Sequence, residues 1–114
     1  MSKNSRRAAA RLLKSAALFA ALGDGTRLEI VAKLADGSQQ SITQLTAGAD
    51  VTRQAITKHL RVLESAGIVQ SAKSGRETLF ALQPRSLEEA QRALAAVSEQ
   101  WDAALARLKD FVEQ

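Results

Sequence analysis

Residues 85–113 carry the feature that most constrains how this chain can fold. Apolar side chains recur there in alternating steps of three and four, at Leu87, Ala90, Leu94, Val97, Trp101, Ala104, Leu108 and Phe111. Such steps place every member on one stripe of a helix. At 1.5 Å per residue this helix is roughly 40 Å long, more than a small domain can cover with its own core. The surplus apolar face therefore predicts self-association, with a homodimer as the simplest assembly.

The length of the chain predicts one small domain, residues 1–114, and its composition predicts an anionic partner. A chain of 114 residues can bury a core without disulfides, and it has no cysteine for disulfides or thiolate metal sites. The formal net charge is +4 and the pI is near 10.0, which favours nucleic acid as a partner. No apolar run is long enough to span a membrane. We expect a cytoplasmic protein without a membrane partner.

Basic side chains are concentrated in two segments. Residues 1–22 hold no acidic residue, and we expect residues 1–7 to be a mobile basic arm that adds non-specific attraction to phosphates. Residues 51–76 hold a single acidic residue, Glu64. The basic residues of the two segments are Lys3, Arg6, Arg7, Arg11 and Lys14, then Arg53, Lys58, Arg61, Lys73 and Arg76.

The order of predicted elements is that of a winged helix-turn-helix, a mostly α fold with a small β-hairpin. Helices are predicted over 8–22, 24–35 (capped by Asp24 or Thr26), 41–47 (with a Ser41–Gln44 capping box) and 53–65 (capped by Thr52), with Gly67 as the C-terminal cap of the last of these. Strands are predicted over 68–73 and 76–82 around a Ser74-Gly75 turn, and Ser86 is expected to cap the last helix, residues 85–113. The helix-turn-helix is thus residues 41–66, the wing hairpin residues 68–82 and the dimerisation helix residues 85–113.

The second helix of this motif has two different faces. Ile56, Leu60 and Leu63 form an apolar stripe for the core. The opposite face carries Arg53, Gln54, Thr57, Lys58 and Arg61, with no carboxylate. In a DNA major groove, Arg and Lys pair with guanine and Gln pairs with adenine. This face predicts sequence-specific binding of double-stranded DNA.

Two cations, Lys73 and Arg76, flank the predicted hairpin turn. A basic hairpin tip beside a helix-turn-helix is typical of a wing that contacts phosphates or the minor groove. A solubilising turn explains this pair equally well.

Three segments resemble the ArsR/SmtB family of winged-helix repressors: "ALGDGTRLEIVAKLADG", "ITQLTAGADVTRQAITKHLRVLESAGIV" and "GRETLFAL". The resemblance covers about residues 15–82, and "WDAALARLKDFVE" is similar to the last helix of one branch. One departure is Gly25, where the family usually has proline, and glycine there should loosen the start of the helix without changing the fold.

The resemblance implies a homodimeric repressor that pairs through its first and last helices and leaves an inverted-repeat operator when a signal arrives. The implied dimer residues are Leu12, Phe19, Leu94, Val97, Trp101, Leu105, Leu108 and Phe111. The family's recognition positions fall on Thr52, Arg53, Gln54, Thr57, Lys58 and His59. We expect His59 to pack against the preceding helix or to donate to a phosphate.

The donors that metal-sensing members of this family use are missing from the sequence, which has no cysteine and one histidine. We therefore expect no metal site and no cofactor. Release from DNA then depends on an organic ligand in the dimer interface, a partner protein or the protein concentration. The sequence alone leaves these three open and identifies no small-molecule effector.

Enzymatic activity is not expected, because His59 lies in the predicted DNA-binding helix and no glycine-rich phosphate loop is present. The alternative function is a winged-helix protein-interaction module that does not bind DNA. The acid-free face of residues 53–61 argues against that alternative.

Overall fold

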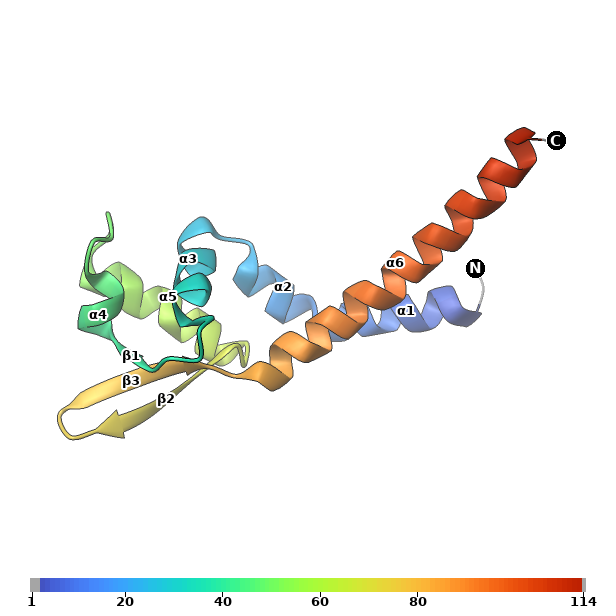
Figure 1. Ribbon diagram of the computed structural model, residues 1–114. Coiled ribbons are helices and arrows are strands. Elements are labelled where there is room, and N and C mark those ends of the chain that lie inside the picture. Colours follow the sequence, from blue (N-terminus) through green and yellow to red (C-terminus); the bar gives the residue numbers. More distant parts are fainter. Residues whose placement is uncertain (1–2, 114) are drawn as a thin grey trace.

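The computed structural model describes residues 3–113, which form six helices and three strands. In chain order these are α1 (Lys3–Lys14), α2 (Ala16–Leu22), α3 (Gly25–Leu34), β1 (Gln40–Ser41), α4 (Ile42–Thr46), α5 (Arg53–Ser65), β2 (Val69–Ser74), β3 (Glu77–Leu82) and α6 (Pro84–Glu113). The predicted winged helix-turn-helix is confirmed. As Figure 1 shows, α2 to α5 and the sheet form a globular end, from which α1 and α6 extend. The whole molecule is 67 Å long.

The core lies between α2, α3, α4, α5, the sheet and the first turns of α6. Its most deeply buried large side chains are Ile30, Leu34, Leu45, Ile56, Leu60, Leu63 and Ile68. They include Ile56, Leu60 and Leu63, the apolar stripe predicted for α5, so the prediction of its core face is confirmed. This packing fixes which face of α5 is turned outward.

Local capping signals set the ends of the helices around the site. Ser41 and Gln44 form the predicted capping box of α4, with each side chain accepting from the other residue's backbone N–H. At the end of α5, Gly67 has a φ of +77°, and Ile68 N–H donates to Leu63 O at 2.9 Å. This bond and the one from Gly67 N–H to Glu64 O form a Schellman motif. The turn leads the chain directly from α5 into the wing.

The first predicted helix differs from the structure in two ways. It begins at Lys3 rather than residue 8, so residues 3–7 of the expected mobile arm form the first turns of α1, whereas residues 1 and 2 lie outside the described part. It also breaks at Ser15. The break has a packing reason, because α1 lies along α6 while α2 turns into the core, where Leu18 and Ala21 are buried.

The sheet is larger than the predicted hairpin and its turn is shifted by one residue. β1 pairs with β3, which gives an antiparallel sheet of order β1-β3-β2. Ser74 pairs with Glu77, so the two-residue turn is Gly75-Arg76 rather than Ser74-Gly75. Gly75 has a φ of +63° at the first central position, as type II′ hairpins require. The last helix starts at Pro84, in the favoured first-turn position for proline, and not after a Ser86 cap.

Replacing Gly25 with proline is expected to stabilise the fold. Gly25 is the first residue of α3, outside the left-handed region, and a Cβ there would meet no atom within 4 Å. Asp24 before it is extended, with φ −135° and ψ 136°, as a residue preceding proline must be. Gly25→Pro should raise the free energy of unfolding by about 0.4–1 kcal/mol by restricting the unfolded chain.

Urea unfolding at fixed protein concentration measures this change. Gly37→Pro is the matched control and should lower stability, because Gly37 has a φ of +83° that proline cannot adopt. A loss of stability in Gly25→Pro would contradict the assigned start of α3.

Candidate nucleic-acid interface

The outward face of α5 brings five predicted DNA-contact residues together. The side chains of Arg53, Gln54, Thr57, Lys58 and Arg61 line one shallow surface hollow. Four of them are exposed, Thr57 is half-buried, and none of the five is acidic. A convex helix with exposed cations and an amide can enter a major groove and reach both phosphates and base edges.

Hydrogen bonds at the start of α5 hold this face in place. Thr52 caps the helix, its hydroxyl accepting from the backbone N–H of Ala55 at 3.1 Å. The guanidinium of Arg53 donates to the Thr43 hydroxyl of α4 at 2.6 Å, so the two helices of the motif are joined by a side-chain contact. The Thr57 hydroxyl donates back to Arg53 O at 2.8 Å. Gln54, Lys58 and Arg61 remain exposed on the same face.

His59 does not line the hollow of the α5 face. Its Nδ1 lies 3.3 Å from a guanidinium nitrogen of Arg27 and 3.8 Å from the carboxylate of Asp24, at the start of α3. Arg27 also donates to the backbone oxygen of Ala21. The backbone N–H of Arg27 holds the pKa of the Asp24 carboxyl below its usual value. These contacts tie α2 and α3 to the inner edge of α5.

Arg27 is the residue that sequence reasoning missed in this interface. It lies outside the helix-turn-helix and reaches α5 across 32 positions of the chain. The "GDGTRL" segment that contains Arg27 contributes to the family resemblance, but the sequence assigns Arg27 no contact or function. Its contacts define it as a positioning residue for α5.

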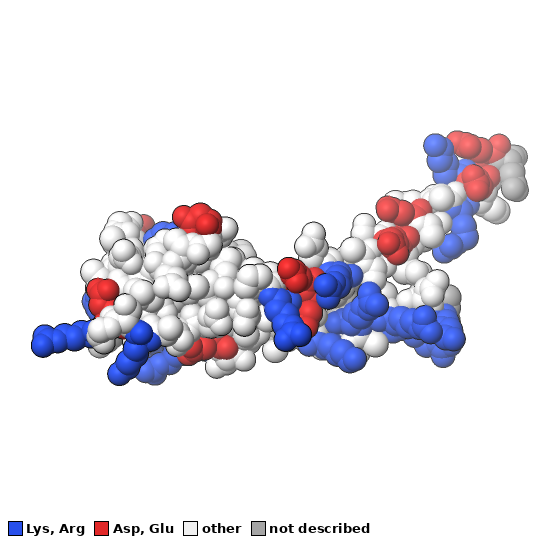
Figure 2. All heavy atoms as spheres, turned by 60° about the horizontal axis from the view of Figure 1, so that its bottom comes forward, with Lys and Arg blue, Asp and Glu red and all other residues white. Residues whose placement is uncertain are grey.

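The wing presents both of its predicted cations to solvent. Lys73 is exposed on β2, and Arg76 is exposed in the turn itself. Figure 2 shows basic side chains at the globular end of the molecule and a second group over the region of α1. Basic charge therefore occurs at both ends of the molecule.

From Leu94 onward, α6 exposes a continuous apolar stripe, which we call the α6 stripe. It consists of Leu94, Trp101, Leu105, Leu108 and Val112, each more than half exposed. Earlier in the same helix, Ala90 and Ala93 are buried, which shows where the chain's own core ends. Figure 1 shows the end of α6 projecting away from the globular end.

The other predicted dimer residues, which are not part of the α6 stripe, lie in three different places. Leu12 and Val97 are half-buried where α1 and α6 face each other, and Phe111 is 76% exposed near the end of α6. Phe19 instead packs, half-buried, against the chain's own core.

Two further features of residues 3–113 concern membranes and metals. No helix in this range has the length and hydropathy needed to cross a bilayer. The same range holds no group of three or more His, Cys, Asp or Glu side chains arranged to bind a metal ion.

Comparison with known proteins places this fold among helix-turn-helix transcriptional regulators. A family model described as "Helix-turn-helix domain" matches residues 22–71. The chain is 42% identical over 66 residues to the HTH-type transcriptional regulator YuzN of Bacillus subtilis, covering 53% of this chain and 72% of YuzN. It is 35% identical over 65 residues to the HTH-type transcriptional repressor SmtB of Mycobacterium tuberculosis, covering 57% of this chain but only 47% of SmtB.

A solved structure extends the similarity to nearly the whole chain. The ArsR-like transcriptional regulator from Rhodococcus sp. RHA1 is 39% identical, with a TM-score of 0.74, over 87% of this chain and 92% of that one. The fold and these similarities together define a helix-turn-helix transcriptional regulator that binds DNA. The chain belongs to the ArsR/SmtB family of such regulators.

Proposed function

We propose that this protein is a homodimeric repressor that binds an inverted-repeat operator and does not respond to transition metals. The observation that carries the proposal is the acid-free, exposed face of α5, residues 53–61, presented by a helix whose other face is locked in the core. Among its relatives, the SmtB protein named above is a transcriptional repressor, which supports repression as the direction of control.

The proposed DNA contacts divide into two groups. From α5 and its cap, Thr52, Arg53, Gln54, Thr57, Lys58 and Arg61 enter the major groove; from the wing, Lys73 and Arg76 contact phosphates or the minor groove. We assign His59 to positioning α5 through Arg27, because its ring is turned toward the start of α3.

The proposed dimer pairs the α6 stripe of one protomer with that of its partner. Two-fold symmetry makes such an interface self-complementary. It also presents two α5 helices to DNA, so the operator half-sites should be about one helical turn, or a small multiple of one, apart. The proposed organisation is residues 41–66 for DNA recognition, 68–82 for the wing and α6 for pairing.

Gln54→Ala and Lys73→Ala should affect operator binding in different ways. Gln54 is an exposed amide on the α5 face, so its removal should cost about 1–3 kcal/mol on the operator and relax preference at one base pair. Lys73 is a wing cation, so its removal should weaken binding to every DNA sequence alike. It should also reduce the slope of log affinity against log salt concentration by about one. Binding titrations on operator and random duplexes over a range of salt compare the two. Equal loss on both duplexes for Gln54→Ala would contradict base readout by this residue.

The metal-independence proposal rests on the available donors. The sequence has no thiolate, and its one histidine contacts Arg27 and Asp24. Operator binding should therefore be unchanged by zinc, cadmium, nickel or arsenite at micromolar concentration. A tenfold change in operator affinity, about 1.4 kcal/mol of coupling, would overturn the proposal.

A further inference from the structure

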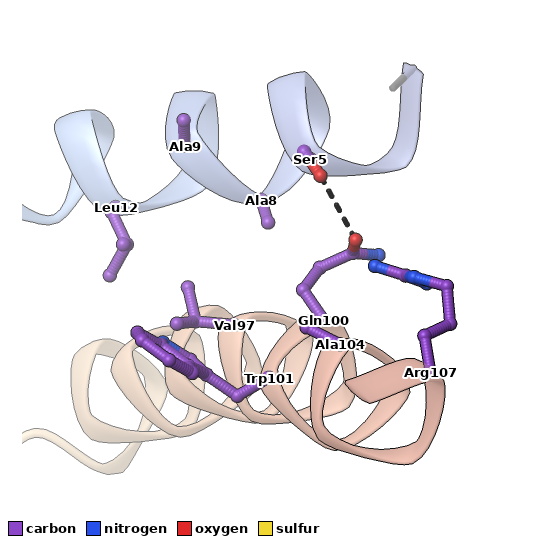
Figure 3. Close-up of a pocket in the computed structure, with 9 residues that line it drawn as sticks. All are labelled: Ser5, Ala8, Ala9, Leu12, Val97, Gln100, Trp101, Ala104 and Arg107. Atoms are coloured by element: carbon purple, nitrogen blue, oxygen red, sulfur yellow. Dashed lines mark hydrogen bonds between the residues drawn. The ribbon is translucent and has the colours of Figure 1, made fainter. Parts of the chain in front are cut away.

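The groove between α1 and α6 combines an apolar floor with hydrogen-bond donors at one end. It has a volume of about 340 Å³, at the small end of the range for ligand sites. Small side chains keep it open: its lining includes Ala8 and Ala9 from α1 and Ala104 from α6. Figure 3 shows Leu12, Val97 and Trp101 grouped at one end of the groove and Arg107 at the other.

The side chains at the polar end of the groove provide hydrogen-bond donors. The Ser5 hydroxyl donates to Oε1 of Gln100 at 2.9 Å, and the other end of that amide, Nε2, is a donor. Figure 3 shows the guanidinium of Arg107 beside the same amide. Gln100 and Arg107 thus both bring donor groups to the groove, and none of the residues lining it is acidic.

We propose that this groove binds a small organic carboxylate with an apolar body, and that this ligand is the effector of the repressor. A carboxylate accepts hydrogen bonds from Arg and amide donors together, and its charge complements Arg107. The apolar body lies over the alanines and against the ring of Trp101. The effector role rests on the proposed function, whereas the binding site does not.

The position of the groove explains how such a ligand would act on DNA binding. Trp101 belongs both to the groove and to the α6 stripe, and it is 65% exposed in the single chain. A ligand between α1 and α6 therefore changes the surface that pairs with the partner, and with it the spacing of the two α5 helices. Ligand binding should weaken operator binding without touching the DNA-contact residues.

Intrinsic fluorescence and calorimetry test the binding site directly. Trp101 is the single tryptophan, so its emission reports on the groove. Octanoate should bind and shift that emission, and octan-1-ol, with the same chain and no charge, should bind at least about tenfold more weakly. Calorimetry without DNA gives the affinity independently of the emission.

Two neighbouring cations of α6 provide a matched pair of variants. Arg107→Gln should weaken octanoate binding at least about tenfold and leave the affinity for octan-1-ol unchanged. Lys109 lies outside the groove lining, so Lys109→Gln should leave both affinities unchanged. Equal octanoate affinity in Arg107→Gln, or no octanoate binding by calorimetry, would overturn the site. Octanoate binding with no effect on operator affinity would overturn the effector role alone, and lack of operator binding without octanoate would count against the proposed function alone.

Discussion

Leu105→Lys should convert the protein to a monomer and abolish operator binding. Leu105 lies in the middle of the α6 stripe and is 56% exposed in the single chain, so the proposed partner is what covers it. Each buried Leu contributes about 1.5–3 kcal/mol, and two-fold symmetry removes the side chain twice. Because pairing can cover only the 56% of the side chain that is exposed, the lost burial alone should raise the dimer dissociation constant at least about tenfold, and the two buried charges should raise it further.

Sedimentation at micromolar concentration measures this change, and circular dichroism checks that the helices remain. Ala103→Lys is the matched control, because residue 103 is exposed on the opposite face of the same helix. It should leave both the dimer and operator binding intact. A Leu105→Lys variant that still sediments as a dimer would show that the α6 stripe is not the pairing surface.

Short-range signals explain why so much of the fold was predictable. The Ser41–Gln44 capping box, the Thr52 cap and the Gly67 C-terminal cap each act within a few residues, and all three were predicted where they occur. They bracket α4 and α5, the second of which carries the proposed DNA-contact face. The inner stripe of α5 was equally readable, because helical periodicity alone separates its two faces.

Features that depend on distant segments were not predictable in the same way. β1 has only two residues and exists because Gln40 pairs with Phe80, far along the chain. The contact between His59 and Arg27 and the Ser5–Gln100 bond across the groove likewise join separate helices. The family resemblance implied a place for Phe19 in the dimer interface, and in the single chain Phe19 packs, half-buried, against the core.

Charge reversal at Lys58 should remove DNA binding while leaving the dimer intact. Lys58 is exposed on the α5 face, and its hollow is lined by two arginines and no acid. Lys58→Glu in both protomers would set two carboxylates against phosphates, and like charges in contact cost several kcal/mol. We expect binding to operator and random DNA to weaken at least about a hundredfold, with sedimentation unchanged.

A graded pair of variants separates lost attraction from added repulsion at this position. Lys58→Gln removes the positive charge without adding a negative one. It should lower the salt slope of DNA binding by about one per protomer and reduce DNA affinity less than Lys58→Glu does. Arg92→Glu changes the net charge as much as Lys58→Glu does, on an exposed position of α6. If binding depended on net charge alone, Arg92→Glu would match Lys58→Glu. If the α5 face is the DNA contact, Arg92→Glu should retain nearly all operator affinity, because its charge is screened beyond about 10 Å at 0.1 M salt.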